Sequence, residues 1–394
     1  MKKRDPIASF RAFSLFLGAA FLVGLFALTL INLFTADRTF SEKENRMLAA
    51  RPDFSMDRLL SGRYRTDVET YVNDQFAGRD FFVSIKAMAD QAMGKREANG
   101  VYLGRDGSLY EQFTPPDADN LDETIAAMQA FAQRHGNLRH YAMVAPTAVN
   151  IYSDRLPHFA PAEDQNPYLD TLFARLGEGN ITPIDLRESF MAHRDQTRLY
   201  YRTDHHWTTP GAYLAFQSAA GALGLDAEAA AFDRAPVTEG FQGTLSAKSG
   251  FLGGTTEAIE MYFPREEMPL VVNYVEEQQR TATLYASENL QKRDAYAAFL
   301  NGNHPLVEIE TAADSARRIL VVKDSYANCF IPFLVPYFSE IVVVDPRYYY
   351  GNLDDLIDYY EISEVLYLYN ANTFFQDTAL RLALQPAADT AGEE

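Results

Sequence analysis

The chain has 394 residues, 47% of them hydrophobic, so it is long enough for a sizeable core in one or two domains. Its formal net charge of −19 argues against a nucleic-acid partner, because nucleic-acid-binding surfaces are basic. A single cysteine excludes an internal disulfide framework and a cysteine-based zinc site.

Residues 1–36 have the pattern of a membrane anchor. The uncharged stretch at 12–34 contains 23 residues, enough to cross a bilayer as a helix and more than the apolar core of a typical signal peptide. This length favours an uncleaved anchor over a cleaved signal. Basic side chains precede the stretch, at Lys2, Lys3, Arg4 and Arg11. They keep that end in the cytoplasm, so we expect a single-pass protein of the cytoplasmic membrane with an extracytoplasmic C-terminal domain.

Residues 37–115 are expected to connect this anchor to the main domain. The segment 81–93 has the spacing of an amphipathic helix. Two short apolar runs flank Asp106-Gly107, a favoured turn pair, which predicts a β-hairpin over 101–110. Pro115-Pro116 then interrupts the chain, so we place the start of the main domain at the second proline.

Helix-like and strand-like segments alternate over residues 116–386. Helical spacing predicts helices at 121–136, 168–176 and 210–223. Short apolar runs predict strands at 141–145, 181–186, 319–323, 341–345 and 365–369. This alternation is typical of an α/β fold with a mostly parallel sheet and helices on both faces, a three-layer sandwich with its sites at the carboxyl ends of strands.

Residues 238–310 interrupt the alternation. Their glycines indicate loops, and the runs 270–274 and 281–285 indicate an antiparallel pair. We therefore expect a β-rich insertion beside the sheet. The tail at 387–394 is small and acidic, so we expect it to be disordered.

The strongest chemical signal is Thr203-Asp204-His205-His206-Trp207, between a predicted strand and a predicted helix. In extended backbone, residues two apart point the same way, so Asp204 and His206 are expected to share a face and His205 to point away. A carboxylate beside an imidazole fixes its tautomer and stabilises its protonated form. Such a pair is useful when a nucleophile is supplied elsewhere.

Ser325 is the predicted nucleophile. It follows the apolar strand at 318–323 and opens a helix-like run, where its own N–H or that of Tyr326 is the default donor to an oxyanion. The chain lacks the Gly-x-Ser-x-Gly elbow of the α/β-hydrolases, because Lys323 and Ala327 stand at the glycine positions. The order acid, histidine, serine is compatible with a triad, which is defined by roles.

These two motifs resemble those of the DHHW proteins, relatives of the SGNH-hydrolase-like alginate O-acetyltransferases AlgJ and AlgX. The resemblance rests on Thr203–Thr208 and Lys323–Asn328 and spans roughly residues 41–375. It implies an SGNH-hydrolase-like fold and a triad of Asp204, His206 and Ser325. It also implies a cell-surface polysaccharide as acetyl acceptor and a membrane-bound O-acyltransferase partner that delivers the acetyl group.

Four more residues are candidates for contacts with the substrate or the oxyanion. Asn303 either adds a side-chain donor or forms a turn. Arg202 either orients an anionic sugar or the acyl carbonyl, or makes an ordinary ion pair. Trp207 either stacks on a sugar or belongs to the core, and His205 is expected to pack or to touch substrate.

A metal site is the main chemical alternative, because Asp204, His205 and His206 are ligand-type residues. We find no second acidic cluster with clear ligand spacing, and the other histidines show no His-x-x-x-His pattern. We therefore expect no metal and no cofactor; acetyl-CoA is not expected outside the membrane.

The favoured hypothesis is a membrane-anchored O-acetyltransferase that modifies a cell-surface polysaccharide through an acetyl-serine on this triad. A carbohydrate esterase with the same triad is an alternative, since the two differ in how water is excluded from the acyl-enzyme. The alternative from another class is a non-catalytic glycan-binding or scaffold protein of an envelope assembly. It predicts that Ser325→Ala leaves function intact.

Overall fold

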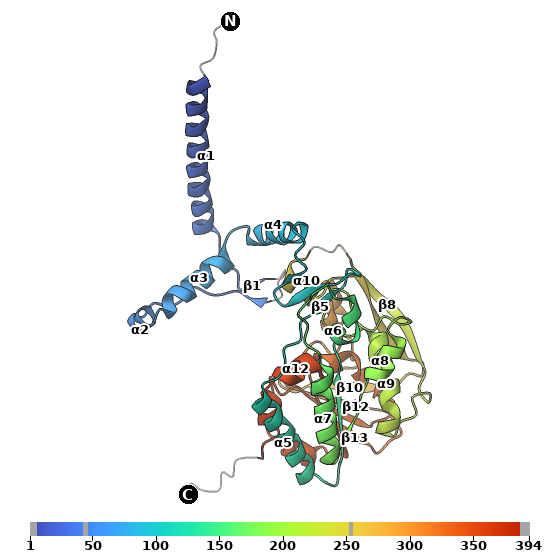
Figure 1. Cartoon of the computed structure of the whole chain (residues 1–394). Helices are drawn as coiled ribbons and strands as arrows, with labels where there is room; N and C mark the ends of the chain where they lie inside the picture. Colours follow the sequence, from blue (N-terminus) through green and yellow to red (C-terminus); the bar gives the residue numbers. More distant parts are fainter. Residues whose placement is uncertain (1–5, 42–45, 252–254, 387–394) are drawn as a thin grey trace. The chain divides into compact units, whose positions relative to one another are not determined.

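The computed structural model describes residues 6–41, 46–251 and 255–386. The chain divides into two compact units, residues 1–94 and 95–394 (Figure 1). The expected disordered tail lies outside the described residues.

The smaller unit begins with the apolar helix α1 (Pro6–Phe34), of which Phe13–Phe34 is long and apolar enough to cross a membrane. The expected apolar helix at 12–34 is thus confirmed, and most of its described large apolar side chains are exposed, as a helix surrounded by lipid requires. The expected amphipathic helix at 81–93 is present as α4 (Arg79–Ala92). The remaining elements of this unit are β1 (Phe40–Ser41), β2 (Arg46–Met47), α2 (Met56–Leu60), α3 (Arg63–Gln75) and α4 (Arg79–Ala92).

The larger unit is built on an eight-stranded sheet with the order β11-β10-β12-β14-β13-β15-β6-β7. The strands from β14 to β7 run parallel, and β12, β10 and β11 extend the sheet in antiparallel pairing beyond β14. Their bounds are β6 (Arg139–Ala145), β7 (Ile181–Pro183), β10 (Leu270–Tyr274), β11 (Gln279–Thr281), β12 (Leu306–Thr311), β13 (Arg318–Lys323), β14 (Glu340–Val344) and β15 (Glu364–Asn370). Every residue of β15 is buried, so both faces of the sheet are covered there. The expected α/β sandwich is confirmed.

Helices connect and cover these strands (Figure 1). They are α5 (Ala118–Arg134), α6 (Ala148–Ile151), α7 (Asn166–Glu178), α8 (Arg187–His193), α9 (Thr209–Leu223), α10 (Thr244–Ser249), α11 (Leu353–Tyr359), α12 (Ala371–Gln376) and α13 (Ala379–Ala383), with short 3-10 turns at Ser153–Arg155, Ser287–Gln291, Ala295–Ala298, Ser325–Cys329 and Ile331–Phe333. The strand expected at 181–186 is shorter: β7 ends at Pro183, and Asp185 accepts the N–H of Arg187 at 3.0 Å in the turn before α8. The Asp204 loop therefore follows a helix and not a strand.

Part of the segment 238–310 joins the main sheet, whereas we expected the whole segment to lie beside it. β10 pairs with β12, which pairs with β14, so these strands form one edge of the main sheet. On its other side β10 pairs with β11, as the expected antiparallel pair requires. The second strand of that pair covers residues 279–281 and not the expected 281–285. A separate antiparallel ribbon is formed by β8 (Phe232–Phe241) and β9 (Glu257–Pro264).

The expected hairpin over 101–110 is present and belongs to the larger unit, which begins at Lys95. It is part of a three-stranded sheet of β3 (Glu97–Ala98), β4 (Val101–Leu103) and β5 (Leu109–Glu111). Gly107 in its turn has a φ of 79°, a conformation that favours glycine.

Candidate active site

Ser325 lies on the tight turn where the chain leaves β13. Asp324 caps this turn, because its Oδ1 accepts the N–H of Tyr326 at 2.9 Å. Its Oδ2 accepts the N–H and the side-chain amide of Asn370, at the end of β15, at 2.9 and 2.6 Å. Asp324 therefore ties the turn to the neighbouring strand. Ser325 is partly exposed, whereas Asp324 and Tyr326 are fully buried.

The loop that carries Asp204 is closed at its base by the pairing of Tyr200 with Trp207. Thr208 then caps α9, its Oγ1 accepting the N–H of Gly211 at 3.1 Å. A Cβ on Gly211 would lie 2.3 Å from the carbonyl oxygen of Leu199, so only glycine allows α9 to begin this close to the loop's entry. Between Tyr200 and Trp207 the backbone is bent at residues 202–206.

The structure brings Asp204, His206 and Ser325 together. His206 Nδ1 lies 2.5 Å from Asp204 Oδ1, and His206 Nε2 lies 2.7 Å from Ser325 Oγ. With Asp204 ionised, Nδ1 carries the proton and Nε2 is left to accept the hydroxyl of Ser325. The predicted nucleophile, base and orienting acid are therefore within hydrogen-bond reach in the order that a triad needs.

Burial and neighbouring charge set the protonation states of this pair. Burial acts to raise the pKa of Asp204, but His206, His205 and a hydrogen bond from Thr244 hold that pKa well below its usual range. Burial and the nearby His205 lower the pKa of His206 to about 4, against the attraction of Asp204. At neutral pH the pair is therefore a carboxylate and a neutral imidazole, the form that can accept a proton.

Gly243 and Thr244 hold the second carboxylate oxygen of Asp204. Asp204 Oδ2 accepts the N–H of Thr244 at 2.7 Å and its Oγ1–H at 2.9 Å. A Cβ on Gly243 would lie 2.2 Å from the Cβ of Asp204, so this approach requires glycine. The spacing of the Asp-His motif gave no sign of either residue.

Glu257 fixes the backbone just before Asp204. Its Oε1 accepts the N–H groups of Arg202 and Thr203 at 2.7 and 3.0 Å and the hydroxyl of Thr203 at 3.1 Å. Thr203 Oγ1 in turn accepts the N–H of Gly243 at 3.1 Å. The two supports of Asp204 are thus connected, and the sequence pattern did not point to Glu257.

The ring of His206 lies between two other rings. Tyr296 stacks on it with a centroid distance of 3.7 Å and an interplanar angle of 12°. The ring of His205 lies at 3.8 Å with an angle of 37°. Two rings this close cannot share one face, so they cover opposite faces and restrict rotation of the imidazole. The hydroxyl of Tyr296 also lies 3.3 Å from the carbonyl oxygen of Ser325, a contact that sequence reasoning missed.

His205 does not point away from Asp204. Its Nδ1 lies 3.7 Å from Asp204 Oδ1 and 2.8 Å from Thr244 Oγ1. The expectation from alternation was wrong because it assumed extended backbone, and the loop is bent from Arg202 to His206.

Trp207 and Tyr326 join the two halves of the site. Trp207 is fully buried and donates its Nε1–H to the carbonyl oxygen of Tyr326 at 2.9 Å, so it belongs to the core and cannot stack on a sugar. The hydroxyl of Tyr326 donates to the carbonyl oxygen of His205 at 2.5 Å. The N–H of Tyr326 already binds Asp324, which leaves the N–H of Ser325 as the better backbone donor to an oxyanion.

Asn303 and Arg202 have different surroundings. Asn303 is exposed, and its Oδ1 accepts Lys323 Nζ at 2.8 Å and Asn328 Nδ2 at 3.2 Å. This leaves its own amide group to donate outside that cluster, so the role as an oxyanion donor stays a prediction. The side chain of Arg202 lines two hollows, neither of which includes a triad residue.

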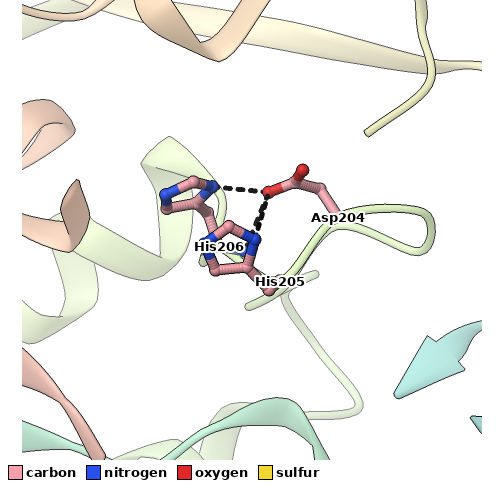
Figure 2. A group of neighbouring side chains, drawn as sticks. All are labelled: Asp204, His205 and His206. Carbon is pink, nitrogen blue, oxygen red and sulfur yellow. Dashed lines mark hydrogen bonds and ion pairs between the residues drawn. The ribbon is translucent and has the colours of Figure 1, made fainter. Parts of the chain in front are cut away.

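Asp204, His205 and His206 also lie close enough together to hold a metal ion, with both imidazoles turned toward the carboxylate (Figure 2). The atoms that a metal would need are engaged: Asp204 Oδ1 by His206, Asp204 Oδ2 and His205 Nδ1 by Thr244, and His206 Nε2 by Ser325. The hydrogen-bonded arrangement therefore fits a triad better than a ligand set.

Comparison with known proteins shows which family the sequence of this chain matches. The family model described as DHHW protein matches residues 95–344, which include Asp204, His206 and Ser325. The chain is similar to probable alginate O-acetylases AlgJ from Pseudomonas fluorescens, 27% identical over 164 residues, and Pseudomonas putida, 28% identical over 172 residues. These matches cover 40% and 42% of this chain. The chain spans only 42% and 44% of the length of these curated relatives.

Solved structures show the same fold. A DHHW family protein from Eubacterium siraeum superposes with a TM-score of 0.62 at 23% identity, covering 73% of this chain and 95% of that one. PatB1 from Bacillus cereus superposes with a TM-score of 0.58 at 21% identity, covering 70% of this chain and 97% of that one. At these identities the likeness establishes the fold.

Proposed function

Because this chain belongs to the DHHW family, we propose that Asp204, His206 and Ser325 form a catalytic triad for O-acetyl transfer to a cell-surface polysaccharide. The observation that carries the proposal is the pair of hydrogen bonds at 2.5 and 2.7 Å. They link a buried carboxylate, a buried neutral imidazole and a partly exposed serine, which is the arrangement that activates a hydroxyl for attack.

In the first half of the reaction, Ser325 Oγ bonds to the carbonyl carbon of an acetyl donor while its proton passes to His206 Nε2. The imidazolium that results is stabilised by Asp204. The tetrahedral intermediate then expels the donor's oxygen, which takes the proton from Nε2, and acetyl-Ser325 remains. We assign stabilisation of the developing oxyanion to the N–H of Ser325 and the side-chain amide of Asn303.

In the second half, a sugar hydroxyl gives its proton to His206 Nε2 and attacks the acetyl-serine. The Ser325–acetyl bond breaks, Ser325 Oγ regains the proton, and the sugar carries the acetyl ester. The names of the AlgJ relatives support a polysaccharide acceptor. Water in place of the sugar would make the same site a carbohydrate esterase.

We place this reaction outside the cytoplasmic membrane. α1 is apolar enough to span the bilayer, and the basic residues before it favour a cytoplasmic N-terminus. An extracytoplasmic site without a cofactor needs its acetyl groups delivered across the membrane. The family resemblance is our ground for proposing a membrane-bound O-acyltransferase as the partner that delivers them.

The test is to trap the acyl-enzyme. The full chain in detergent is mixed with an activated acetyl ester, and the acetylated residue is identified by mass spectrometry. We expect one acetyl group on Ser325 and none in Ser325→Ala, whereas Ser218→Ala, which changes an exposed serine on α9, keeps the adduct. Equal acetate release by wild type and Ser325→Ala, with no adduct, would instead favour the non-catalytic scaffold.

Adding acceptors separates transferase from esterase. Candidate polysaccharides are offered to the acetylated enzyme, and the products are followed by mass spectrometry. Transfer predicts acetyl esters on the sugar and faster loss of acetyl-Ser325. Release of free acetate at the same rate with and without the polysaccharide identifies an esterase.

A further inference from the structure

Helix α4 in the smaller unit exposes an apolar face. Phe81, Phe82, Ile85 and Met88 are between 42% and 63% exposed. At about 100° per residue they fall within a sector of roughly 120°, which we call the α4 apolar face. Lys86 lies outside this sector and pairs with Asp90 at 3.4 Å. α4 is therefore amphipathic, with its apolar face directed to the surroundings.

The beginning of α4 is attached to the end of α1. Ala77, two residues before α4, donates its N–H to Asn32 Oδ1 at 2.7 Å. Just after α1, Arg38 donates its N–H to Gln75 Oε1, and Gln75 Nε2 donates to the carbonyl oxygen of Arg38, both at 2.9 Å. These bonds hold the last residue of α3 and the short segment just before α4 at one end of the apolar helix.

That end of α1 lies at a defined depth if α1 crosses the bilayer. Phe13–Phe34 has 22 residues, and at about 1.5 Å per residue it spans about 33 Å. The hydrocarbon core of a bilayer is about 30 Å thick, so Asn32, third from the end of α1, lies near its boundary with the headgroups. The start of α4 is therefore at the same boundary.

We propose that α4 lies in the membrane–water interface, with the α4 apolar face inserted among lipid headgroups and acyl chains. Interfacial helices of this kind bury an aromatic and aliphatic face and leave charged side chains toward water. Lipid is the occupant because the attached helix α1 carries the same exposed apolar surface into the bilayer. The inference rests on α1 spanning the membrane and not on the chemistry of the triad.

This placement shortens the tether of the catalytic unit. α4 ends at Ala92, and the larger unit begins at Lys95, so Met93 and Gly94 alone separate them. The chain between the proposed interfacial helix and the larger unit is therefore only two residues long. With α4 in the interface, the larger unit stays close to the membrane surface, and the proposed acetyl transfer would take place there. If the about 60 residues after α1 were a flexible linker, the larger unit could move much farther from the membrane.

The experiment uses the full chain in vesicles of phosphatidylethanolamine and phosphatidylglycerol. Ile85→Cys and the matched control Lys86→Cys are each labelled with an environment-sensitive fluorophore. Wild type, whose single Cys329 is fully buried, gives the background. We expect nitroxide-bearing lipids to quench the label at 85 several-fold more than iodide does, and iodide to quench the label at 86 more strongly.

Two results would overturn the proposal. Equal access of iodide to both labels means that the α4 apolar face is in water. If neither the nitroxide-bearing lipids nor iodide quenches the label at residue 85, then protein covers the α4 apolar face. Phe26→Cys, within α1, must be quenched by the lipids; if it is not, the anchor itself is wrong, whereas acetylation of Ser325 tests the triad separately.

Discussion

The serine turn and the Asp204 loop reach the same site by different means. The turn is held by the residue beside the serine, Asp324, which is fixed to the next strand of the same sheet. The loop is held by residues from the interrupting segment, chiefly Thr244 and Glu257. The sheet therefore positions the proposed nucleophile, and the segment after α9 positions the proposed acid–base pair. Changes in that segment should alter proton transfer while leaving Ser325 in place.

The largest loss of activity is expected for Asp204→Asn, which replaces the carboxylate beside His206 with a neutral amide. The neutral amide no longer stabilises the imidazolium and favours the wrong tautomer of His206, so the rate of acetyl-Ser325 formation should fall about 10,000-fold. Rapid-quench mass spectrometry measures this rate. A loss below tenfold would remove Asp204 from the triad.

Gly243→Ala should reduce the same rate by about 100-fold, because the new Cβ would displace Asp204 by an ångström or more. Gly240→Ala is the matched control, since a Cβ there meets nothing within 4 Å. Both variants are compared at equal folded concentration, checked by thermal unfolding. Equal rates for the two variants would mean that the approach of Gly243 to Asp204 is unimportant.

Tyr296→Leu should lower the rate about tenfold, because the imidazole loses the ring that stacks on it. Tyr296→Phe keeps the stacked ring and removes only the hydroxyl near Ser325 and Cys329. We expect the phenylalanine variant to retain most activity with an unchanged pH profile. The stacking explanation fails if both variants lose activity equally.

The smallest effect concerns pH. His206 is a base only when neutral, so activity is lost as pH falls through its pKa, which burial and His205 lower to about 4. His205→Phe keeps a ring beside His206 but removes the charge, so the acidic limb of kcat/KM should move to higher pH. His193→Phe, on α8, is the control. An unmoved limb would show that His205 does not act on His206 electrostatically.

The sequence predicted the parts of this site that depend on local pattern. The apolar run before Ser325 indicated a buried strand, and β13 with its capped turn follows that expectation. The spacing of Asp204 and His206 indicated that their side chains meet, and their hydrogen bond agrees with this, although the loop is bent and not extended as the spacing argument assumed. Both inferences need only short-range geometry together with a family resemblance.

The rest depended on long-range contacts that leave no local pattern. His205 was misplaced because the bend in its loop is imposed by Glu257 and Gly243, which come later in the chain. Tyr296 lies on a short 3-10 turn, which has no periodicity to detect. The edge strands β10 to β12 were taken for an insertion because their position is set by pairing with β14.

Trp207 gives the protein a built-in optical probe. It is the only tryptophan in the chain, it is fully buried, and its indole N–H donates to the carbonyl oxygen of Tyr326, next to Ser325. Excitation at the red edge of indole absorption therefore reports on this one place, free of signal from elsewhere. Acetylation of Ser325 or a shift of its turn is therefore expected to change the emission, so the proposed reaction can be followed in real time without an added dye.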